Sequence, residues 1–362
     1  MRSRWGLDGA RAVALLAVPV VVVAVGAASA LAPDPAPPAD EAPPGPAIGR
    51  FERELQVEAF HRGNLHTHSL ESDGDVPPED VYRWYRAHDY QFVALTDHNR
   101  RVEPSVYRHL ERPGFKILAG EEVTMLGGGR QVHVNALCTQ SAIRGGTFGT
   151  RAEALRYAID RIDAQRGIAL INHPNFDRSL GADDLWEGRS AALLEIMSGH
   201  PYVYSNGVDA RPSHEALWAE LLTRGAELHG VAVDDAHHYA DDKSLEKTAR
   251  PGRAWIGTFA VPGADVRADA TCEAIRSGSF YASNGPRLAR LEVGERTFTV
   301  WPADKTATVV FLGPGDRVLA TEQSSANGAT YALSGDERWV RARIERADGS
   351  KAWTQPMRVV SR

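Results

Sequence analysis

Histidine and carboxylate residues recur just after short apolar runs of this sequence. His66 and His68 follow the first run two residues apart, so on an extended strand both side chains point to one face, about 7 Å apart. Asp73 comes five residues later, in a Ser-Asp-Gly turn that can bring its carboxylate back towards the strand end. A lone His-x-His pair is usually structural, so a metal site needs further partners.

Further candidates follow or lie within later apolar runs. They are His98, Glu122, His133, His173, Asp235 and His237. The two-residue spacing of Asp235 and His237 again predicts that both lie on one strand face. The strand tips of a parallel α/β barrel converge on one rim, so residues at those tips can meet. Imidazole and carboxylate ligands without thiolate suit Zn, Fe or Mn better than Ca or Mg. His133, taken alone, fits a structural histidine equally well.

The elements that must position these residues alternate between strands and helices. Strands are predicted over residues 92–95, 116–119, 132–137, 168–171, 193–197 and 228–233. Helices are predicted over residues 78–88, 155–162 and 212–225. This alternation predicts parallel strands covered by helices, as an α/β barrel or an open sheet.

The pattern of apolar and polar residues changes after Pro286. Short alternating stretches at residues 297–301, 307–312, 329–333 and 339–344 are separated by Gly, Asp, Asn and Ser clusters. This pattern predicts a small all-β, sandwich-like C-terminal domain over residues 287–362.

The N-terminus has the features of an export signal. Arg2, Arg4 and Arg11 precede an uncharged stretch that ends in the small residues Ala28-Ser29-Ala30. Residues 1–32 are therefore predicted to be a signal peptide or, alternatively, an uncleaved anchor that tethers the chain to a membrane through residues 12–32. Residues 33–47 form a Pro-rich linker. We expect the rest of the chain to be exported, to the periplasm or outside the cell.

Charge and cysteine content exclude several classes of protein. The 362 residues include 41 basic and 47 acidic side chains, a net charge of −6, without a concentrated basic run. A dedicated nucleic-acid-binding protein is therefore not indicated. Cys138 and Cys272 are too few for a disulfide framework or a cysteine-rich zinc site. The sequence leaves the oligomeric state open.

Four motifs resemble those of the PHP (polymerase and histidinol phosphatase) superfamily of metallohydrolases, and most closely its carbaryl-hydrolase-like branch. The motifs lie at residues 64–68, 95–99, 172–174 and 234–237, and the resemblance covers residues 60–285. It implies a distorted (β/α)7 barrel over residues 48–286 that holds two or three divalent ions.

The resemblance also implies a ligand set for each ion. The first ion would take His66, His68, Glu122 and Asp235, the second Glu122, His133 and His173, and the third Asp73, His98 and His237. The family's Gly-x-Glu spacing selects Glu122 over its neighbour Glu121, because strand alternation lets only one of them face the ions. Glu122, Asp235 and His237 are the expected catalytic residues.

The sequence therefore predicts an exported metal-dependent hydrolase. We favour a phosphoesterase that uses a metal-bridging hydroxide on a small-molecule ester. A carboxylester or carbamate hydrolase with the same metal centre is the alternative, and a non-enzymatic polysaccharide-binding module ranks third. Arg100 and Arg101 are candidates for extra charge beside a phosphate, although two arginines in a loop are more often solvated surface. His200 is a further candidate for the rim, although a structural role is favoured for it.

Overall fold

The computed structural model describes residues 49–239 and 249–360. The predicted signal peptide or anchor (residues 1–32) and the Pro-rich linker (residues 33–47) lie outside these ranges, and both remain predictions. Within the described ranges, no helix is both long and apolar enough to cross a membrane.

One sheet contains the first strands of the predicted α/β region. β3 (Ala59–Asn64), β4 (Phe92–Ala94) and β5 (Lys116–Leu118) pair in parallel. On the other side of β3, β12 (Trp255–Ala260) pairs antiparallel with β3 and with β13 (Phe280–Ser283). This part is therefore a mixed sheet, although its first strands are parallel as predicted.

The second sheet has the order β11-β10-β9-β7-β6-β8. Its strands are β6 (Glu122–Gly127), β7 (Arg130–Leu137), β8 (Thr147–Phe148), β9 (Ile168–Ile171), β10 (Leu193–Ser198) and β11 (His229–Val233). The last three pair in parallel, but β6 and β7 form an antiparallel hairpin. The expectation of parallel strands is wrong here because Gly128 and Gly129, with φ of 57° and 76°, let the chain reverse without a helix.

The two sheets meet at two single bridges. Thr67 pairs with Ala236, and His98 pairs with Glu122. Among the described residues, the strand ladders do not close into a ring, so a mixed α/β fold is shown and a closed barrel is not. The first bridge joins residues next to candidate ligands, and the second joins two candidate ligands.

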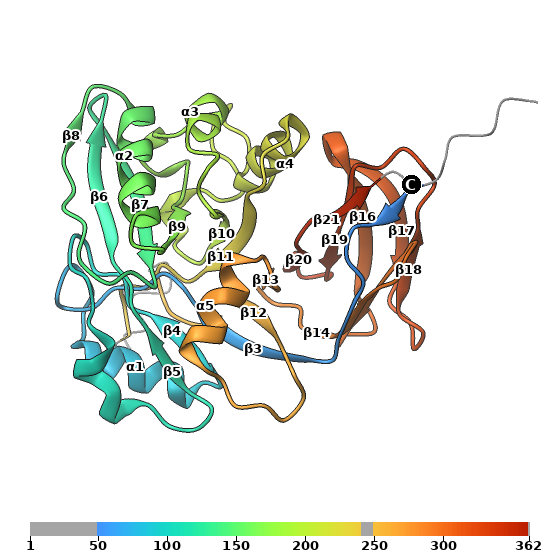
Figure 1. Ribbon diagram of the computed structural model, residues 1–362, viewed down its shortest axis with the longest axis horizontal. Helices are drawn as coiled ribbons and strands as arrows, with labels where there is room; N and C mark the ends of the chain where they lie inside the picture. Colours follow the sequence, from blue (N-terminus) through green and yellow to red (C-terminus); the bar gives the residue numbers. More distant parts are fainter. Residues whose placement is uncertain (1–48, 240–248, 361–362) are drawn as a thin grey trace, which may run out of the picture. The chain divides into compact units, whose positions relative to one another are not determined.

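The predicted helices are confirmed. They are α1 (Pro78–Ala87), α2 (Arg151–Asp163) and α4 (His214–Arg224), and the structure adds α3 (Ala182–Glu187) and α5 (Ala268–Arg276). Short 3₁₀ helices include η1 (Pro104–Leu110), η2 (Phe176–Arg178), η3 (Pro201–Val203) and η5 (Pro314–Asp316). α2 begins with a capping box between Thr150 and Glu153 and packs its buried face against β6, β7 and β9 (Figure 1).

The chain after Pro286 consists mainly of strands. They are β14 (Leu288–Val293), β15 (Thr297–Pro302), β16 (Thr308–Gly313), β17 (Arg317–Gln323), β18 (Ala329–Ala332), β19 (Trp339–Glu345), β20 (Lys351–Thr354) and β21 (Met357–Val360). Each of the four predicted alternating stretches matches one of these strands to within one residue at either end, and the strands are orange to red in Figure 1.

Strand pairs cross the expected domain boundary at Pro286. β20 pairs with β13, β14 pairs with β2 (Leu55–Val57), and β21 pairs with β1 (Arg50–Phe51). The described residues also all belong to one compact unit. Separate domains over residues 48–286 and 287–362 stay a prediction.

A disulfide joins Cys138, the residue after β7, to Cys272 in α5. Two cysteines are too few for a framework of several disulfides, and this single bond was not predicted from the sequence. Its two cysteines are 134 residues apart in the chain.

A buried ion network connects α4 to the C-terminal strands. Arg341 of β19 is fully buried, and its Nη1 donates to Glu215 Oε1 of α4 at 3.0 Å. Arg343 donates to the same oxygen at 3.0 Å, and the other Arg341 amino group donates to Asp316. The Arg341 guanidinium also lies 4.9 Å from the centre of the Trp218 ring. Glu215 thus balances two arginines at this junction.

Glu215→Gln is expected to lower the free energy of unfolding by about 3 kcal/mol or more, because it leaves Arg341 buried without its full counter-charge. Glu220→Gln is the matched control on the same helix. Glu220 pairs with Arg224 at the surface, where such pairs contribute about 1 kcal/mol or less. Urea unfolding of both variants measures the difference, and equal losses would contradict the assignment.

Candidate metal centre

The segments that follow β3 and β11 lie side by side. His68 N donates to Ala236 O, and Asp235 N donates to His66 O, both at 2.9 Å. We expected Asp235 and His237 to share one strand face, and this is wrong because β11 ends at Val233 and Asp235 has a φ of 49°. The left-handed turn, rather than strand alternation, positions these two residues.

Glu122 is the centre of the side-chain cluster. Its Oε2 lies 3.3 Å from Nε2 of both His66 and His68, and Asp235 Oδ1 lies 3.3 Å from the same two nitrogens. Its Oε1 lies 2.9 Å from His133 Nδ1 and 3.3 Å from His173 Nε2. The two oxygens of one carboxylate therefore face two different groups of ligands.

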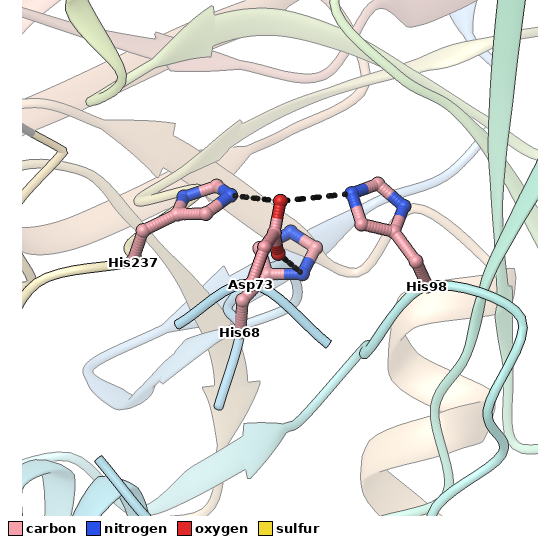
Figure 2. Close-up of side chains that lie close together, drawn as sticks. All are labelled: His68, Asp73, His98 and His237. Atoms are coloured by element: carbon pink, nitrogen blue, oxygen red, sulfur yellow. Dashed lines mark ion pairs between the residues drawn. The ribbon is translucent and has the colours of Figure 1, made fainter. Parts of the chain in front are cut away.

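A third group gathers around Asp73. Its Oδ2 lies 3.4 Å from His98 Nε2 and 3.5 Å from His237 Nε2, and its Oδ1 lies 3.5 Å from His68 Nδ1. Figure 2 shows this carboxylate between the three rings. The Asp73 side chain is 52% exposed, so this group lies at the open side of the centre.

The structure brings together all nine residues that the sequence singles out. Their ligand atoms fall into four groups that can each hold an ion: His68, Asp73, His98 and His237; His66, Glu122 and His173; His66, His68 and Asp235; and His98, Glu122 and His133. Metal binding by these residues remains a prediction.

Hydrogen bonds outside the centre orient two of the rings. His237 Nδ1 lies 3.0 Å from Asp235 O, so Nδ1 carries a proton and leaves Nε2 for the centre. His98 Nδ1 lies 2.6 Å from Thr124 Oγ1, which leaves its Nε2 facing Asp73. Partners of this kind fix metal-binding histidines in other proteins.

Glu195 is a supporting residue that sequence reasoning missed. It is fully buried in β10, its Oε2 accepts a hydrogen bond from His173 N at 3.1 Å, and the same oxygen lies 3.4 Å from His66 Nδ1. The sequence did contain a signal for this role, namely a carboxylate inside the apolar run of residues 193–197. Glu195 helps to hold two of the candidate ligands.

Asp97 organises the loop that carries Asp73. It accepts hydrogen bonds from Ser69 N, Ser69 Oγ and Ser72 Oγ, at 2.7 to 2.8 Å. Gly74 lets the loop turn tightly, because a Cβ at this position would lie 2.7 Å from His68 O. The loop that carries Asp73 is thus held in place by a buried neighbour of His98.

The residues adjacent to two ligands face away from the centre. Glu121 Oε2 accepts from Ile143 N at 2.9 Å. Asp234 accepts from the amides of residues 252–254 and from the Tyr85 hydroxyl. The choice of Glu122 and Asp235 over these neighbours agrees with this geometry.

Arg100 and Arg101 do not line the cavity at the centre. Arg100 pairs with Glu71, and Arg101 donates to Thr139 O and pairs with Glu103. The expectation that they add charge beside a phosphate is therefore wrong for the described structure.

The buried donor atoms fit divalent ions. Within the described part of the chain, His66 Nε2, His68 Nε2 and Glu122 Oε2 are buried without a hydrogen-bond partner, although unpaired buried polar atoms are costly. Histidine nitrogens and carboxylate oxygens without thiolate suit Zn, Mn or Fe. The residues present thus fit the ions that the resemblance implies.

The clustered charges shift one another's pKa. Burial favours a higher pKa for Glu122, but the charges of His66, His133 and His98 outweigh burial and hold its pKa well below the usual value. Burial lowers the pKa of His237, but the hydrogen bond to Asp73 and the charge of Asp235 raise it to about 9. In the metal-free protein, His237 is therefore protonated at neutral pH.

The centre opens into a cavity of about 340 Å³. Besides the ligands, Gln131, Phe176, His200, Val203 and His238 line it. His200 is thus placed on the rim, as one of the two interpretations expected, and its Nδ1 accepts a hydrogen bond from Tyr202 N at 3.2 Å.

Comparisons with known proteins give distant likenesses. No protein-family model matches the chain, and no curated protein sequence matches it. A two-domain protein from Bacteroides vulgatus, containing a predicted PHP-like metal-dependent phosphoesterase, has 14% identity and a TM-score of 0.45 over 86% of this chain and 98% of its own. An amidohydrolase from Chromobacterium violaceum has 16% identity and a TM-score of 0.38 over 55% of this chain and 92% of its own. Likenesses this distant do not establish a function for this chain.

Glu122→Gln is expected to lower metal affinity by more than about a hundredfold, because it removes the negative charge of a carboxylate whose two oxygens face two different groups of ligands. Glu121→Gln keeps an acceptor for Ile143 N and is the matched control. Elemental analysis of both folded variants after dialysis against Mn or Zn measures the effect. Similar metal loss in the two variants would show that the ligand assignment is wrong.

Metal affinity is also expected to rise with pH between 7 and 9, by about tenfold per pH unit for each proton displaced. The reason is that an ion bound by Asp73, His98 and His237 must displace the proton of His237, whose pKa is about 9. Calorimetric titration with Mn²⁺ at several pH values measures the slope, and His237→Ala should reduce it. A pH-independent affinity in the unmodified protein would contradict this account.

Proposed function

We propose that this chain is a metal-dependent hydrolase of the PHP superfamily, and specifically a phosphoesterase that acts on a small-molecule ester. The observation that carries the proposal is the geometry of Glu122, whose two oxygens face separate histidine groups. Asp73 collects a third group next to them. Three adjacent ion positions suit a phosphate monoester, because its dianionic group can contact all of them.

The chemistry of the centre follows from this arrangement. When bound, divalent ions such as Zn, Mn or Fe lower the pKa of a coordinated water from about 15.7 towards about 7 and polarise the ester oxygen. Glu122 and Asp235 hold their carboxylates ionised in a buried place, where few water molecules compete with a ligand. His237 and Asp73 lie on the open side, where an ester can approach.

One observation supports a carboxylester or carbamate hydrolase as the second candidate. Among the described residues that line the cavity, there is neither an arginine nor a lysine. Phosphate sites commonly include such side chains, whereas an acyl or carbamate group does not need them. The same metal centre serves both reactions.

Export and the finer fold assignment belong to the same proposal. The Cys138–Cys272 disulfide supports export, because such bonds persist mainly in oxidising compartments. The distorted seven-stranded barrel, the carbaryl-hydrolase-like branch and a tether through residues 12–32 rest on the sequence patterns alone.

The full chain loaded with Mn or Zn is expected to hydrolyse p-nitrophenyl phosphate faster than bis-p-nitrophenyl phosphate or p-nitrophenyl acetate. Chelation should abolish the activity and re-addition of metal should restore it, while Glu122→Gln should stay inactive. Turnover of the acetate alone would favour the second candidate. Activity that survives both chelation and Glu122→Gln would overturn the metal-dependent hydrolase altogether.

A further inference from the structure

Two loops form an apolar wall, made by Phe176 and Val203, in the cavity that His133 and His173 also line. Phe176, in η2, has its ring centre 5.2 Å from that of His173 and 5.7 Å from that of His133. Val203, in η3, is almost fully buried and lines the same cavity. A molecule held at the centre therefore meets apolar side chains on this side.

The wall is built before any ligand arrives. Asn175 is fully buried between the two loops, and its Nδ2 donates to Tyr204 O at 3.1 Å and to Pro212 O at 3.0 Å. Arg211 Nε donates to Asn175 Oδ1 at 2.9 Å. These bonds tie the loop that carries Phe176 to the loop that carries Val203, so binding need not order them.

Charged groups in the cavity favour a substrate with a single anionic group. The described lining residues include the carboxylates of Asp73, Glu122 and Asp235 but neither lysine nor arginine. The arginines of the two loops are engaged elsewhere, since Arg178 pairs with Asp209 and Arg211 also donates to Leu180 O. The ions can neutralise one phosphate, but a second anionic group finds no cation on the described wall.

His200 adds one polar contact to this wall. Its Nδ1 accepts from Tyr202 N, so the neutral ring carries its proton on Nε2. The ring lies 5.3 Å from that of His237, beside the open ligand group. This places a hydrogen-bond donor where the alcohol oxygen of an ester can reach it.

We infer that this cavity selects esters whose alcohol part is uncharged and apolar, and best of all aromatic. Phe176 and Val203 contact the alcohol part, while the ions hold the acidic group. The inference rests on the proposed hydrolase function and narrows its substrate class.

Benzyl phosphate and ethyl phosphate form the test pair, because both release a primary alcohol of similar acidity. For the metal-loaded full chain, kcat/KM should be at least about tenfold higher for the benzyl ester. Phe176→Ala should remove most of this preference while it retains its metal by elemental analysis. Leu126→Ala is the control, because Leu126 is an exposed apolar residue that does not line the cavity, and it should keep the preference.

Binding provides a second readout that needs no turnover. Benzylphosphonate should bind at least about tenfold more tightly than ethylphosphonate in calorimetry, and Phe176→Ala should remove the difference. Equal affinities, or faster turnover of an ethyl phosphate that carries a second phosphate group, would overturn the inference.

The proposed hydrolase function and the inferred preference for an aromatic alcohol part can be contradicted separately. If only acetates are hydrolysed, the phosphoesterase is wrong, and benzyl acetate against ethyl acetate then tests the wall. If no ester is hydrolysed, the hydrolase is wrong, and the two phosphonates still decide whether the wall prefers an aromatic group.

Discussion

One buried carboxylate holds both the centre and the sheets together. The Glu122 side chain faces five imidazoles, and its charge is compatible with burial only because they surround it. Its backbone also joins the two sheets, since Glu122 N donates to Asp97 O and Asn99 N donates to Glu122 O. The position of this residue thus couples the geometry of the fold to that of the ligands.

Buried polar residues around the cluster support the candidate ligands, and three of them directly precede a ligand in the sequence. In Asp97-His98, Asn172-His173 and Asp234-Asp235, the second residue faces the centre and the first holds the surrounding backbone or side chains. Asn172 also donates directly to Glu122 Oε1 at 2.8 Å. Such pairs satisfy the buried polar groups of each turn while they aim a ligand inward.

The sequence predicted many of the strands, the helices α1, α2 and α4, and the nine clustered residues, because apolar runs and the polar residues after them are local signals. It did not predict the β6–β7 hairpin or the left-handed turn at Asp235, which depend on the conformation of a few turn residues. Glu195 looked like part of an apolar run, and its role appears only when His66 and His173 are placed beside it. Pairings such as β13 with β20 join segments that are far apart in the chain, and no local sequence pattern predicts them.

The pairing of β1 with β21 has a consequence for the order of folding. β1 lies near the start of the described chain, and its partner is the last described strand, so their pairing waits until almost the whole chain has been synthesised. β2 likewise waits for β14, and β13 keeps an unpaired edge until β20 is available. Contacts between such distant segments form slowly, and the exposed edges invite aggregation in the meantime. A growing chain therefore cannot complete the partners of β1, β2 and β13 before its C-terminal strands have been made.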